Sequence, residues 1–581
     1  MWQKTGTLSI RPTMRLKFTA VKNSTFIKII MNKTKIYILA AVALISTVVF
    51  HSSCNDKEEL LTSEPEFDQN SISSLTTGEE AEELMEFAPP SENPYTIPNM
   101  QRALDSLSKV NENECDLTLF DIRITHKYIK FKPQDSAQYG LLIQDTTLEL
   151  FDYPLDRKLI KAGTYYQDLS LTEGQPNYQW TAVKVDKQLP AGVPFDVLAE
   201  LYIPEEDPQL VQYYETPFDD CITELIDMAM KITGNFDTTE TYEVTDGGLH
   251  YKRRRSKWNP RGRIRLEDNV LNSINGLEGA KVRARRWFTT RSMLTDRNGN
   301  FSTSHQFRRP ANYSIKWERN DYNIRSGRHG QAYFNGPKIK GDWNLDIVSG
   351  VSWFYGHAHR GAHTYYYQNN LNIESPPRNG FLGSRIAIGV CDQQGRAHYK
   401  HAQRMWFGPE IFMYTSEDDG NGGTVIPNSM RFYETTIHEL AHASHFNLSH
   451  WHYRNTDRIV KESWAVGVAY YFTRQIYPAD VWDWQDLPLD DPSSTRDMVD
   501  WGERRYTPFV IDVIDNDNQR VNFSGDTRYP VDRCTEFTLA EVEDQLERRR
   551  TLNAWRDGLK SYRRVPDAIL DELTANYTAI Q

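Results

Sequence analysis

Glu434-Thr-Thr-Ile-His438-Glu439-Leu-Ala-His442-Ala-Ser-His445 decides how the fold of this 581-residue chain is interpreted, because it contains the pattern His-Glu-x-x-His. Apolar residues recur between the polar ones and no Pro or Gly interrupts the segment, so it is predicted to be a helix. On a helix, His438 and His442 share one face, where two imidazoles can bind one zinc ion. Glu439 lies beside them and can accept the proton of a zinc-bound water, whose pKa is about 7.

A third ligand is predicted in a second segment. Glu462 follows His442 by 20 residues, within the run 461–472. This run is apolar nearly all round, which is typical of a buried helix. If that helix crosses the first one, a single carboxylate reaches the metal and the fourth position is left to water. The sequence therefore predicts one Zn²⁺ ion bound by His438, His442 and Glu462, with Glu439 as the catalytic residue.

These four residues resemble the gluzincin metallopeptidases, which carry His-Glu-x-x-His and a downstream Glu. The resemblance covers the two segments quoted above. It implies that His438, His442 and Glu462 bind zinc and that Glu439 is the general base. The best-known members have an Asn before the third ligand and an Asp four residues after it, whereas Lys461 and a Val stand there in this sequence. The groups that orient the two imidazoles are therefore not identified from the sequence.

Three further histidines follow the motif. A metzincin-type site would need Gly at position 445 and His at 448, where the sequence has His445 and Leu448. His445, His450 or His452 could replace Glu462 as the third ligand. Since His445 lies about two helical turns from the first histidine of the motif, a supporting or structural role is predicted for it.

A second pair of histidines, His359 and His363, is also spaced by four residues, in the predicted helix 353–367. No acidic residue lies in that segment. These histidines are therefore predicted to be packing or surface residues rather than a second metal site.

Other features are expected beside the zinc. A sheet edge next to the active-site helix would pair with an extended substrate, and the predicted strands at 384–390 and 410–414 are the two candidates. A donor is also needed to stabilise the oxyanion. Tyr506, His452 and Tyr453 are all possible, and the sequence does not choose among them.

Residues 1–53 are predicted to be a targeting sequence. A basic segment begins at Met31, and an apolar run at 36–50 is shorter than the ~20 residues of a membrane-spanning helix. Small residues then precede Cys54, which resembles a bacterial lipoprotein signal. Cys54 is therefore predicted to be lipidated, with Met31 as the start of translation and the preceding residues as excess. An uncleaved membrane anchor is the alternative.

Residues 54–95 are acidic and contain Ser, Thr and Pro, which predicts a disordered tether. Residues 1–53 carry eight Lys or Arg and no acidic residue, so their removal changes the net charge from −12 to −20. Such an acidic protein is not expected to bind nucleic acid. The acidic cluster directly after Cys54 resembles an export signal to the outer face of the outer membrane, which predicts a surface-exposed lipoprotein of a Gram-negative bacterium. A solvated spacer is the alternative interpretation of the same residues.

The rest of the chain is predicted to be multidomain. Residues 96–250 are interpreted as a β-rich or α+β region of unknown role, and residues 330–581 as an α-rich, α+β zincin-like peptidase domain. Between them, 259–325 resembles a carboxypeptidase-regulatory-like (transthyretin-like) β-sandwich, in which a turn like Thr295-Asp-Arg-Asn-Gly-Asn-Phe301 recurs. In that family the module is accessory, so a binding or spacing role is expected.

The periodicity predicts helices at 99–110, 221–233, 353–367, 506–515 and 539–560, and strands at 147–153, 195–203, 262–265, 277–287, 313–317, 384–390 and 410–414.

Four cysteines remain if Cys54 is lipidated: Cys115, Cys221, Cys391 and Cys534. Their spacing contains no Cys-x-x-Cys pair, so cysteine ligation of zinc is not expected. Export permits disulfides, and three pairings are possible.

Taken together, these features predict a zinc-dependent peptidase. It would hydrolyse peptide bonds in a protein or glycoprotein substrate at the bacterial cell surface, attached to the membrane through the lipid on Cys54. The alternative is a surface-anchored binding or adhesion lipoprotein whose zinc site is structural or inactive. A water-accessible fourth zinc position and cleavage of peptides would distinguish the two.

Overall fold

The computed structural model describes residues 83–109, 115–172, 175–213, 216, 218–237, 242–245, 248–251, 257–380, 385–400, 409–418, 423–478, 499–500, 503–504 and 506–579. Cys54 and the predicted signal sequence lie outside the described residues. Residues Gly78–Gln581 form one unit, which is mixed α/β, with several sheets and twelve α-helices in its described part. This agrees with the expected α+β organisation. Among the same residues, no helix is both long and apolar enough to cross a membrane.

The last part of the expected tether is ordered. From Glu83 onward the chain packs on the N-terminal region, because Met85 and Tyr95 are buried in its core. Two short strands pair there, β1 (Glu86–Phe87) and β3 (Leu159–Lys161). The prediction of disorder up to residue 95 is therefore wrong for residues 83–95. Apolar residues in this segment, such as Met85 and Tyr95, anchor it to the core of the N-terminal region.

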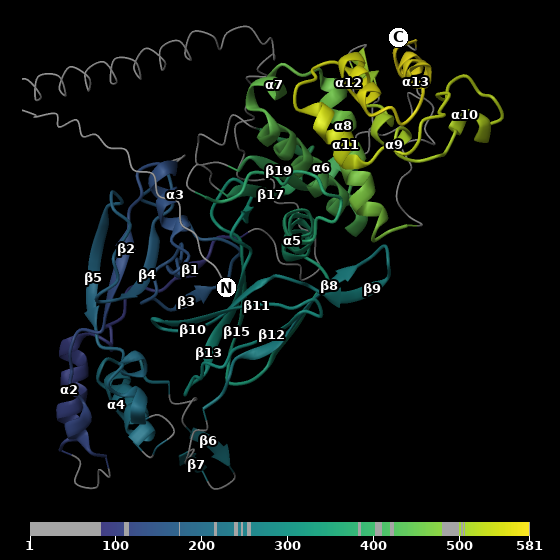
Figure 1. Ribbon diagram of the computed structural model, residues 1–581. Helices are drawn as coiled ribbons and strands as arrows, with labels where there is room; N and C mark the ends of the chain where they lie inside the picture. Colours follow the sequence, from purple (N-terminus) through teal and green to yellow (C-terminus); the bar gives the residue numbers. More distant parts are fainter. Residues whose placement is uncertain are drawn as a thin grey trace, which may run out of the picture. The chain divides into compact units, whose positions relative to one another are not determined.

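The N-terminal region is built on a three-stranded antiparallel sheet (Figure 1). Its strands, in spatial order, are β4 (Gln179–Lys184), β2 (His126–Phe131) and β5 (Phe195–Leu201). Its helices are α2 (Ile97–Leu107), α3 (Ser136–Gln144) and α4 (Phe218–Ile232). The predicted helices at 99–110 and 221–233 and the strand at 195–203 are thus confirmed. A disulfide joins Cys115 to Cys221 on α4, whereas Cys391 and Cys534 are buried elsewhere.

The predicted strand at 147–153 is wrong. Only an isolated bridge between Phe151 and Trp180 forms there. The carbonyl oxygen of Leu150 accepts hydrogen bonds from Arg283 Nη2 (2.9 Å) and Lys316 Nζ (3.1 Å) instead of from a neighbouring strand. Side chains from a distant part of the sequence therefore replace the ladder that the alternating pattern predicted.

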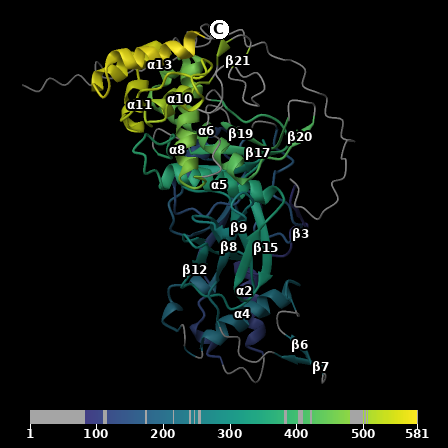
Figure 2. The same ribbon diagram turned by 90° about the vertical axis from the view of Figure 1, so that its right-hand side faces the viewer.

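Two sheets form the β-sandwich (Figures 1 and 2). One contains β11 (Thr289–Leu294), β10 (Lys281–Arg286), β13 (Ala311–Lys316) and β15 (Tyr333–Ile339). The other contains β12 (Asn300–Ser302), β8 (Arg261–Asp268) and β16 (Trp343–Ile347), with β9 (Ser273–Gly276) paired to β8. The expected Asn-Gly turn forms, with Gly299 at φ +81°, and a Cβ there would lie 2.0 Å from the Ile264 carbonyl oxygen.

The sandwich and the C-terminal part do not separate near residue 330 as the sequence suggested. Strand β14 (Tyr322–Ser326) leaves the sandwich and pairs with a sheet of the C-terminal part, after which β15 and β16 return to the sandwich. Asp268, at the end of β8, is buried and reinforces the junction. Its carboxylate accepts hydrogen bonds from Ser429 Oγ (2.6 Å), Tyr477 Oη (2.6 Å) and Arg360 Nη1 (2.7 Å).

The C-terminal sheet has the spatial order β14, β17 (Ile386–Gln394), β19 (Ile411–Asp418), β18 (His398–Tyr399), with β20 (Thr424–Val425) also paired to β19. The first three strands are parallel and β18 is antiparallel. Helix α5 (Val351–Tyr367) contacts β14 and β17, and α6 (Ser429–Leu448) contacts β19 and β18. The two predicted strands are confirmed, but β17 and β19 both lie inside the sheet, so the expectation that one of them forms the edge beside the motif is wrong. The described strand at the edge beside α6 is β18.

The remaining helices are α7 (His450–Arg454), α8 (Arg458–Arg474), α9 (Phe509–Asp512), α10 (Gln519–Asn522), α11 (Leu539–Leu546), α12 (Leu552–Leu559) and α13 (Asp567–Ala579). Two hairpins, β6 (Tyr242–Thr245) with β7 (Gly248–Tyr251) and β21 (Val499–Asp500) with β22 (Glu503–Arg504), complete the described strands.

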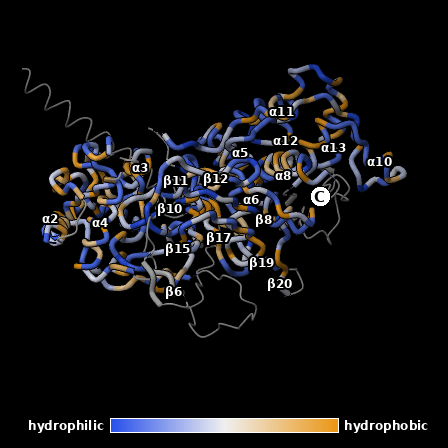
Figure 3. The backbone as a smooth tube through the Cα atoms, turned by 90° about the horizontal axis from the view of Figure 1, so that it is seen from below, coloured by the Kyte–Doolittle hydropathy of each residue, from blue (hydrophilic) through white to orange (hydrophobic). Residues whose placement is uncertain are grey.

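The single helix predicted at 539–560 is wrong, because it divides into α11 and α12. The Thr551 side chain caps α12 by accepting from Ala554 N, and the Trp555 indole donates to the Val542 carbonyl (2.9 Å). The buried indole thereby folds α12 back on α11. One continuous apolar core extends from the sandwich through α8 to α13, and orange segments mark α8 in Figure 3.

Candidate metal centre

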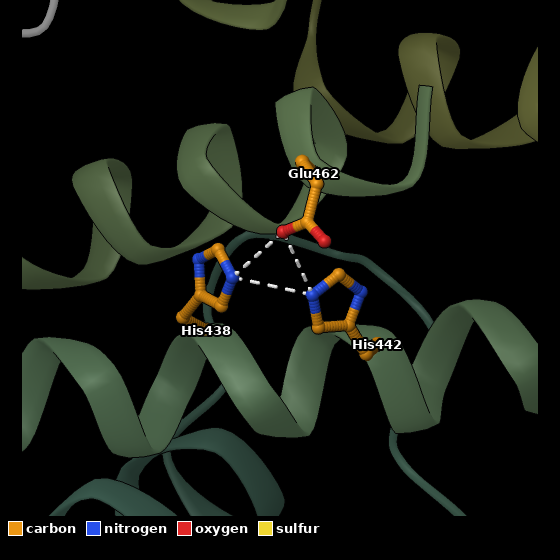
Figure 4. Close-up of side chains that lie close together, drawn as sticks. All are labelled: His438, His442 and Glu462. Atoms are coloured by element: carbon orange, nitrogen blue, oxygen red, sulfur yellow. Dashed lines mark hydrogen bonds and ion pairs between the residues drawn. The ribbon is translucent and has the colours of Figure 1, made fainter. Parts of the chain in front are cut away.

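The motif lies on α6, as predicted. Asn428 caps the helix by accepting a hydrogen bond from Arg431 N at 2.8 Å. Ile437, Leu440 and Ala441 are fully buried on the core side of the helix. The helical period then places the two histidines of the motif together on the side that faces α8 (Figure 4).

Helix α8 supplies the third group. It is buried along most of its length and packs against α6. A Cβ at Gly467 would lie 2.4 Å from Val510, so this glycine allows α9 to approach α8 closely. Glu462, in the second turn of α8, points toward His438 and His442 of α6 (Figure 4).

Three ligand atoms converge. His438 Nε2 lies 3.2 Å from His442 Nε2, and Glu462 Oε2 lies 3.3 Å and 3.2 Å from these two nitrogens. Ligands held tetrahedrally about 2.0–2.2 Å from a zinc ion lie about 3.3–3.6 Å from one another. The three residues therefore form a possible metal-binding triad, the only such group of three or more His, Cys, Asp or Glu found among the described residues.

The triad is packed but not sealed. The side chains of His438 and Glu462 remain 17% and 15% exposed, and that of His442 is 8% exposed. The side chains that carry the three atoms are therefore partly exposed to solvent. A fourth ligand could bind there.

Electrostatics couple the triad to its surroundings. Burial opposes the charge on Glu462, but the two histidines outweigh burial and hold its pKa well below the ordinary value. Burial likewise opposes protonation of His442, and the Glu462 carboxylate raises the pKa of His442 overall. Arg458 Nε lies 3.8 Å from the second Glu462 oxygen, one helical turn earlier on α8. The carboxylate is thus ionised and held from its far side.

Glu439 is buried, and burial is the main reason that its pKa is raised. The negative charge of Glu462 also raises this pKa. The positive charges of His438, His442 and Arg396 oppose the increase. These interactions place Glu439 near the triad, as the sequence predicts. A buried carboxylate with a raised pKa, next to the three residues of the triad, is suited to proton transfer. Arg396, in the connection between β17 and β18, had no recognisable sequence signal.

Two of the three candidate oxyanion donors lie near the triad. The ring centroid of Tyr506 is 6.4 Å from that of His438, and burial followed by the Glu462 charge raises the Tyr506 pKa to about 12. Burial also raises the pKa of Tyr453, with contributions from Glu462 and Glu439. Both hydroxyl groups therefore keep their protons at neutral pH. For His452, no contact with the triad is found in the described part of the chain.

The other histidines after the motif serve packing. His445 is buried, its ring contacts the Tyr453 ring edge-on at 4.9 Å, and burial holds its pKa well below the ordinary value. His450 stacks on Phe446 at 4.4 Å. Neither belongs to the triad found among the described residues.

The predicted second pair does not form such a group in the described structure. His359 Nε2 donates to the Glu278 carbonyl oxygen (2.9 Å), and its Nδ1 accepts from Tyr322 Oη (3.0 Å). His363 packs beside the Tyr367 ring at 5.3 Å. Both are buried, as expected for packing residues.

Comparison with known protein families found no matching family model, and comparison with curated proteins found no match. The function is therefore inferred from the geometry of the site.

Proposed function

We propose that this protein is a zinc-dependent peptidase. The observation that carries the proposal is the convergence of two imidazole nitrogens and one carboxylate oxygen at 3.2–3.3 Å, in side chains that are partly exposed to solvent. This donor set suits zinc, whereas calcium and magnesium prefer oxygen ligands throughout. Three protein ligands and an open position are typical of catalytic rather than structural zinc sites.

In the proposed reaction, His438, His442 and Glu462 hold the ion. When bound, zinc supplies Lewis acidity toward a carbonyl and lowers the pKa of water. Glu439 accepts the proton of the attacking water and delivers it to the leaving amine. Tyr506 or Tyr453 donates a hydrogen bond to the oxyanion, since both keep their protons at neutral pH. An extended peptide would pair with the sheet edge at β18, next to α6.

The setting of this activity follows from the sequence. The segment before Cys54 resembles a lipoprotein signal, so we place the peptidase at the surface of a Gram-negative outer membrane, anchored through Cys54. The substrate is then a protein or glycoprotein outside the cell. The ligand set and Glu439 resemble those of gluzincins, and the sandwich resembles a transthyretin-like accessory module.

The direct test is metal analysis of the purified protein combined with digestion of a proteome-derived peptide mixture, with and without a chelator. We expect one zinc ion per chain, and cleavage that the chelator abolishes and added zinc restores. One bound zinc ion without cleavage of any peptide would favour the adhesion alternative with a structural or inactive site. Cleavage that persists without metal would contradict the proposal.

A further inference from the structure

A second site is suggested by a cavity of about 370 Å³, within the size range of ligand pockets. It lies between the segment that follows α3, strands β10, β11 and β13 of the sandwich, and Arg385 at the start of the C-terminal sheet. None of its lining residues is on α6 or α8. The cavity is therefore separate from the metal centre.

Cations gather around one carboxylate in the cavity wall. Glu318 is contacted by Lys316 Nζ (3.0 Å), Lys281 Nζ (3.1 Å) and Arg385 Nη1 (2.8 Å). Glu318 and Lys316 are almost completely buried, and the Arg385 side chain is 9% exposed. One buried carboxylate thus faces three cations, of which Lys316 and Arg385 are buried and Lys281 is 22% exposed.

A second carboxylate, Glu149, does not balance the cluster. It pairs with Lys281 at 3.3 Å and with Arg283, a fourth cation with no exposed surface. Four cations therefore face two carboxylates in this group of described residues. If Asp152 is counted, whose oxygens accept from Gln179 and Tyr333, the cations still exceed the carboxylates by one. Asp145 also lines the cavity, but its charge is paired with Lys187 at 2.7 Å, whereas Arg283 lies behind the wall and does not line the cavity.

Donor groups also remain unused. Arg385 Nε and two guanidinium nitrogens of Arg283 are buried and have no hydrogen-bond partner within the described structure. Burial, together with Arg283 and Lys281, lowers the pKa of Lys316 to about 8 despite the nearby carboxylates. Uncompensated buried positive charge is costly, and a bound anion would reduce that cost.

Another part of the wall is apolar. Leu142, Leu148, Leu150, Met293 and Leu294 line it, and Leu294 is 52% exposed, which places it toward the surface. A ligand that fits the whole cavity needs an acidic group at the cationic end and an apolar body along these side chains.

We propose that this cavity binds a small organic carboxylate, whose acidic group contacts Lys316, Lys281 and Arg385 and whose apolar body packs on the leucines. The proposal is independent of the peptidase activity. It assigns a ligand-binding role to the junction between the N-terminal region and the sandwich.

The test is isothermal titration calorimetry of the full chain with N-acetylphenylalanine and with its neutral amide. We expect the carboxylate to bind at least about 10-fold more tightly than the amide, because only the carboxylate offsets the excess positive charge. Inorganic phosphate serves as a probe of charge without an apolar body and is expected to bind more weakly than N-acetylphenylalanine.

Two variants and a matched control accompany the titration. Lys316→Met removes one buried cation at similar volume, and Leu294→Asp places a negative charge at the partly exposed end of the cavity. Ile274→Asp makes the same kind of change at a 40% exposed sandwich residue outside the cavity. We expect at least about 10-fold weaker binding in the first two and unchanged binding in the third.

The proposal is overturned if N-acetylphenylalanine does not bind, if the amide binds equally well, or if phosphate binds more tightly. It is also overturned if folded Leu294→Asp binds as the wild type does, which keeps the test decisive even if Lys316→Met fails to fold. Zinc content and peptide cleavage are expected to be unchanged in Leu294→Asp, so this outcome is separable from the proposed peptidase activity.

Discussion

Two helices of the C-terminal part each carry histidines four residues apart, and only one pair forms a candidate metal site. On α6, the Nε2 atoms of His438 and His442 face each other at 3.2 Å and meet the Glu462 carboxylate. On α5, both ring nitrogens of His359 are occupied, one by a backbone carbonyl and one by a tyrosine hydroxyl.

The electrostatic surroundings differ in the same way. Burial lowers the pKa of His359 to about 3 and that of His363 to about 4, and the charge of Arg319 adds to both decreases. On α6, the Glu462 charge overcomes burial and raises the pKa of His442. Helical spacing therefore supplies two imidazoles, but a carboxylate from a second helix decides whether they can hold a cation.

The largest expected effect comes from removing one imidazole of the α6 pair. In His438→Ala, zinc affinity should fall by more than about 100-fold, since losing a direct ligand costs more than the 10–100-fold loss typical of outer partners. Peptide cleavage should be lost with the metal. Metal analysis after gel filtration measures the first effect, and the peptide digest measures the second. One zinc ion per chain in this variant would show that His438 is not needed for metal binding, and the contrast between the α6 and α5 pairs would then not hold.

The matched change on α5 tests the opposite expectation. In His359→Phe, two buried hydrogen bonds are lost, and the Tyr322 hydroxyl and the Glu278 carbonyl lose partners, so stability should fall by about 2–4 kcal/mol. Thermal unfolding detects this loss. Zinc content per folded chain should stay at one ion, and a fall in the zinc content of the folded variant would mean that the α5 pair takes part in metal binding.

A smaller effect on stability is expected from a change at Asp268, whose hydrogen bonds join helices α5 and α6 to the sandwich. Hydrogen bonds from Ser429, Tyr477 and Arg360 outweigh burial and lower the pKa of Asp268 to about 2. Since the folded-state pKa is below the unfolded value of about 3.9, the ionised carboxylate contributes stability above pH 4, and this contribution is lost as the pH falls toward 2. Asp268→Asn should therefore lower the stability by about 2 kcal/mol at pH 7.

Denaturant unfolding at several pH values checks this expectation. The difference between wild type and Asp268→Asn should shrink between about pH 4 and pH 2. A difference that does not change with pH would show that the hydrogen bonds, rather than the charge, carry the effect.

The sequence predicted the local parts of this comparison. The spacing of the α6 histidines and the apolar run around Glu462 identified the two helices and the three side chains that the structure brings together. The α5 pair was predicted to be packing or surface residues, from the lack of an acidic residue in its own segment, and the structure shows that both histidines are buried. The partners of His359 were not predictable, because Glu278 and Tyr322 are distant in sequence and reach α5 only through the sandwich and β14.

The failures have a common physical reason. The segment 147–153 has the alternating pattern of a strand, but the Leu150 carbonyl oxygen accepts hydrogen bonds from the side chains of Arg283 and Lys316 instead of from a neighbouring strand. The pairing of β14 with the C-terminal sheet is not indicated by the composition of the sequence. The division of 539–560 depends on the docking of Trp555 against Val542. Each depends on a tertiary contact, which periodicity does not report.

The most direct test of the central claim compares wild type with Glu439→Gln in paired assays of zinc content and peptide cleavage. We expect one zinc ion per chain in both proteins and a loss of cleavage of about 100-fold or more in the variant, because His438, His442 and Glu462 are intact and the proton acceptor is gone. Full cleavage by Glu439→Gln, or a wild-type protein that binds no zinc, would contradict the central claim.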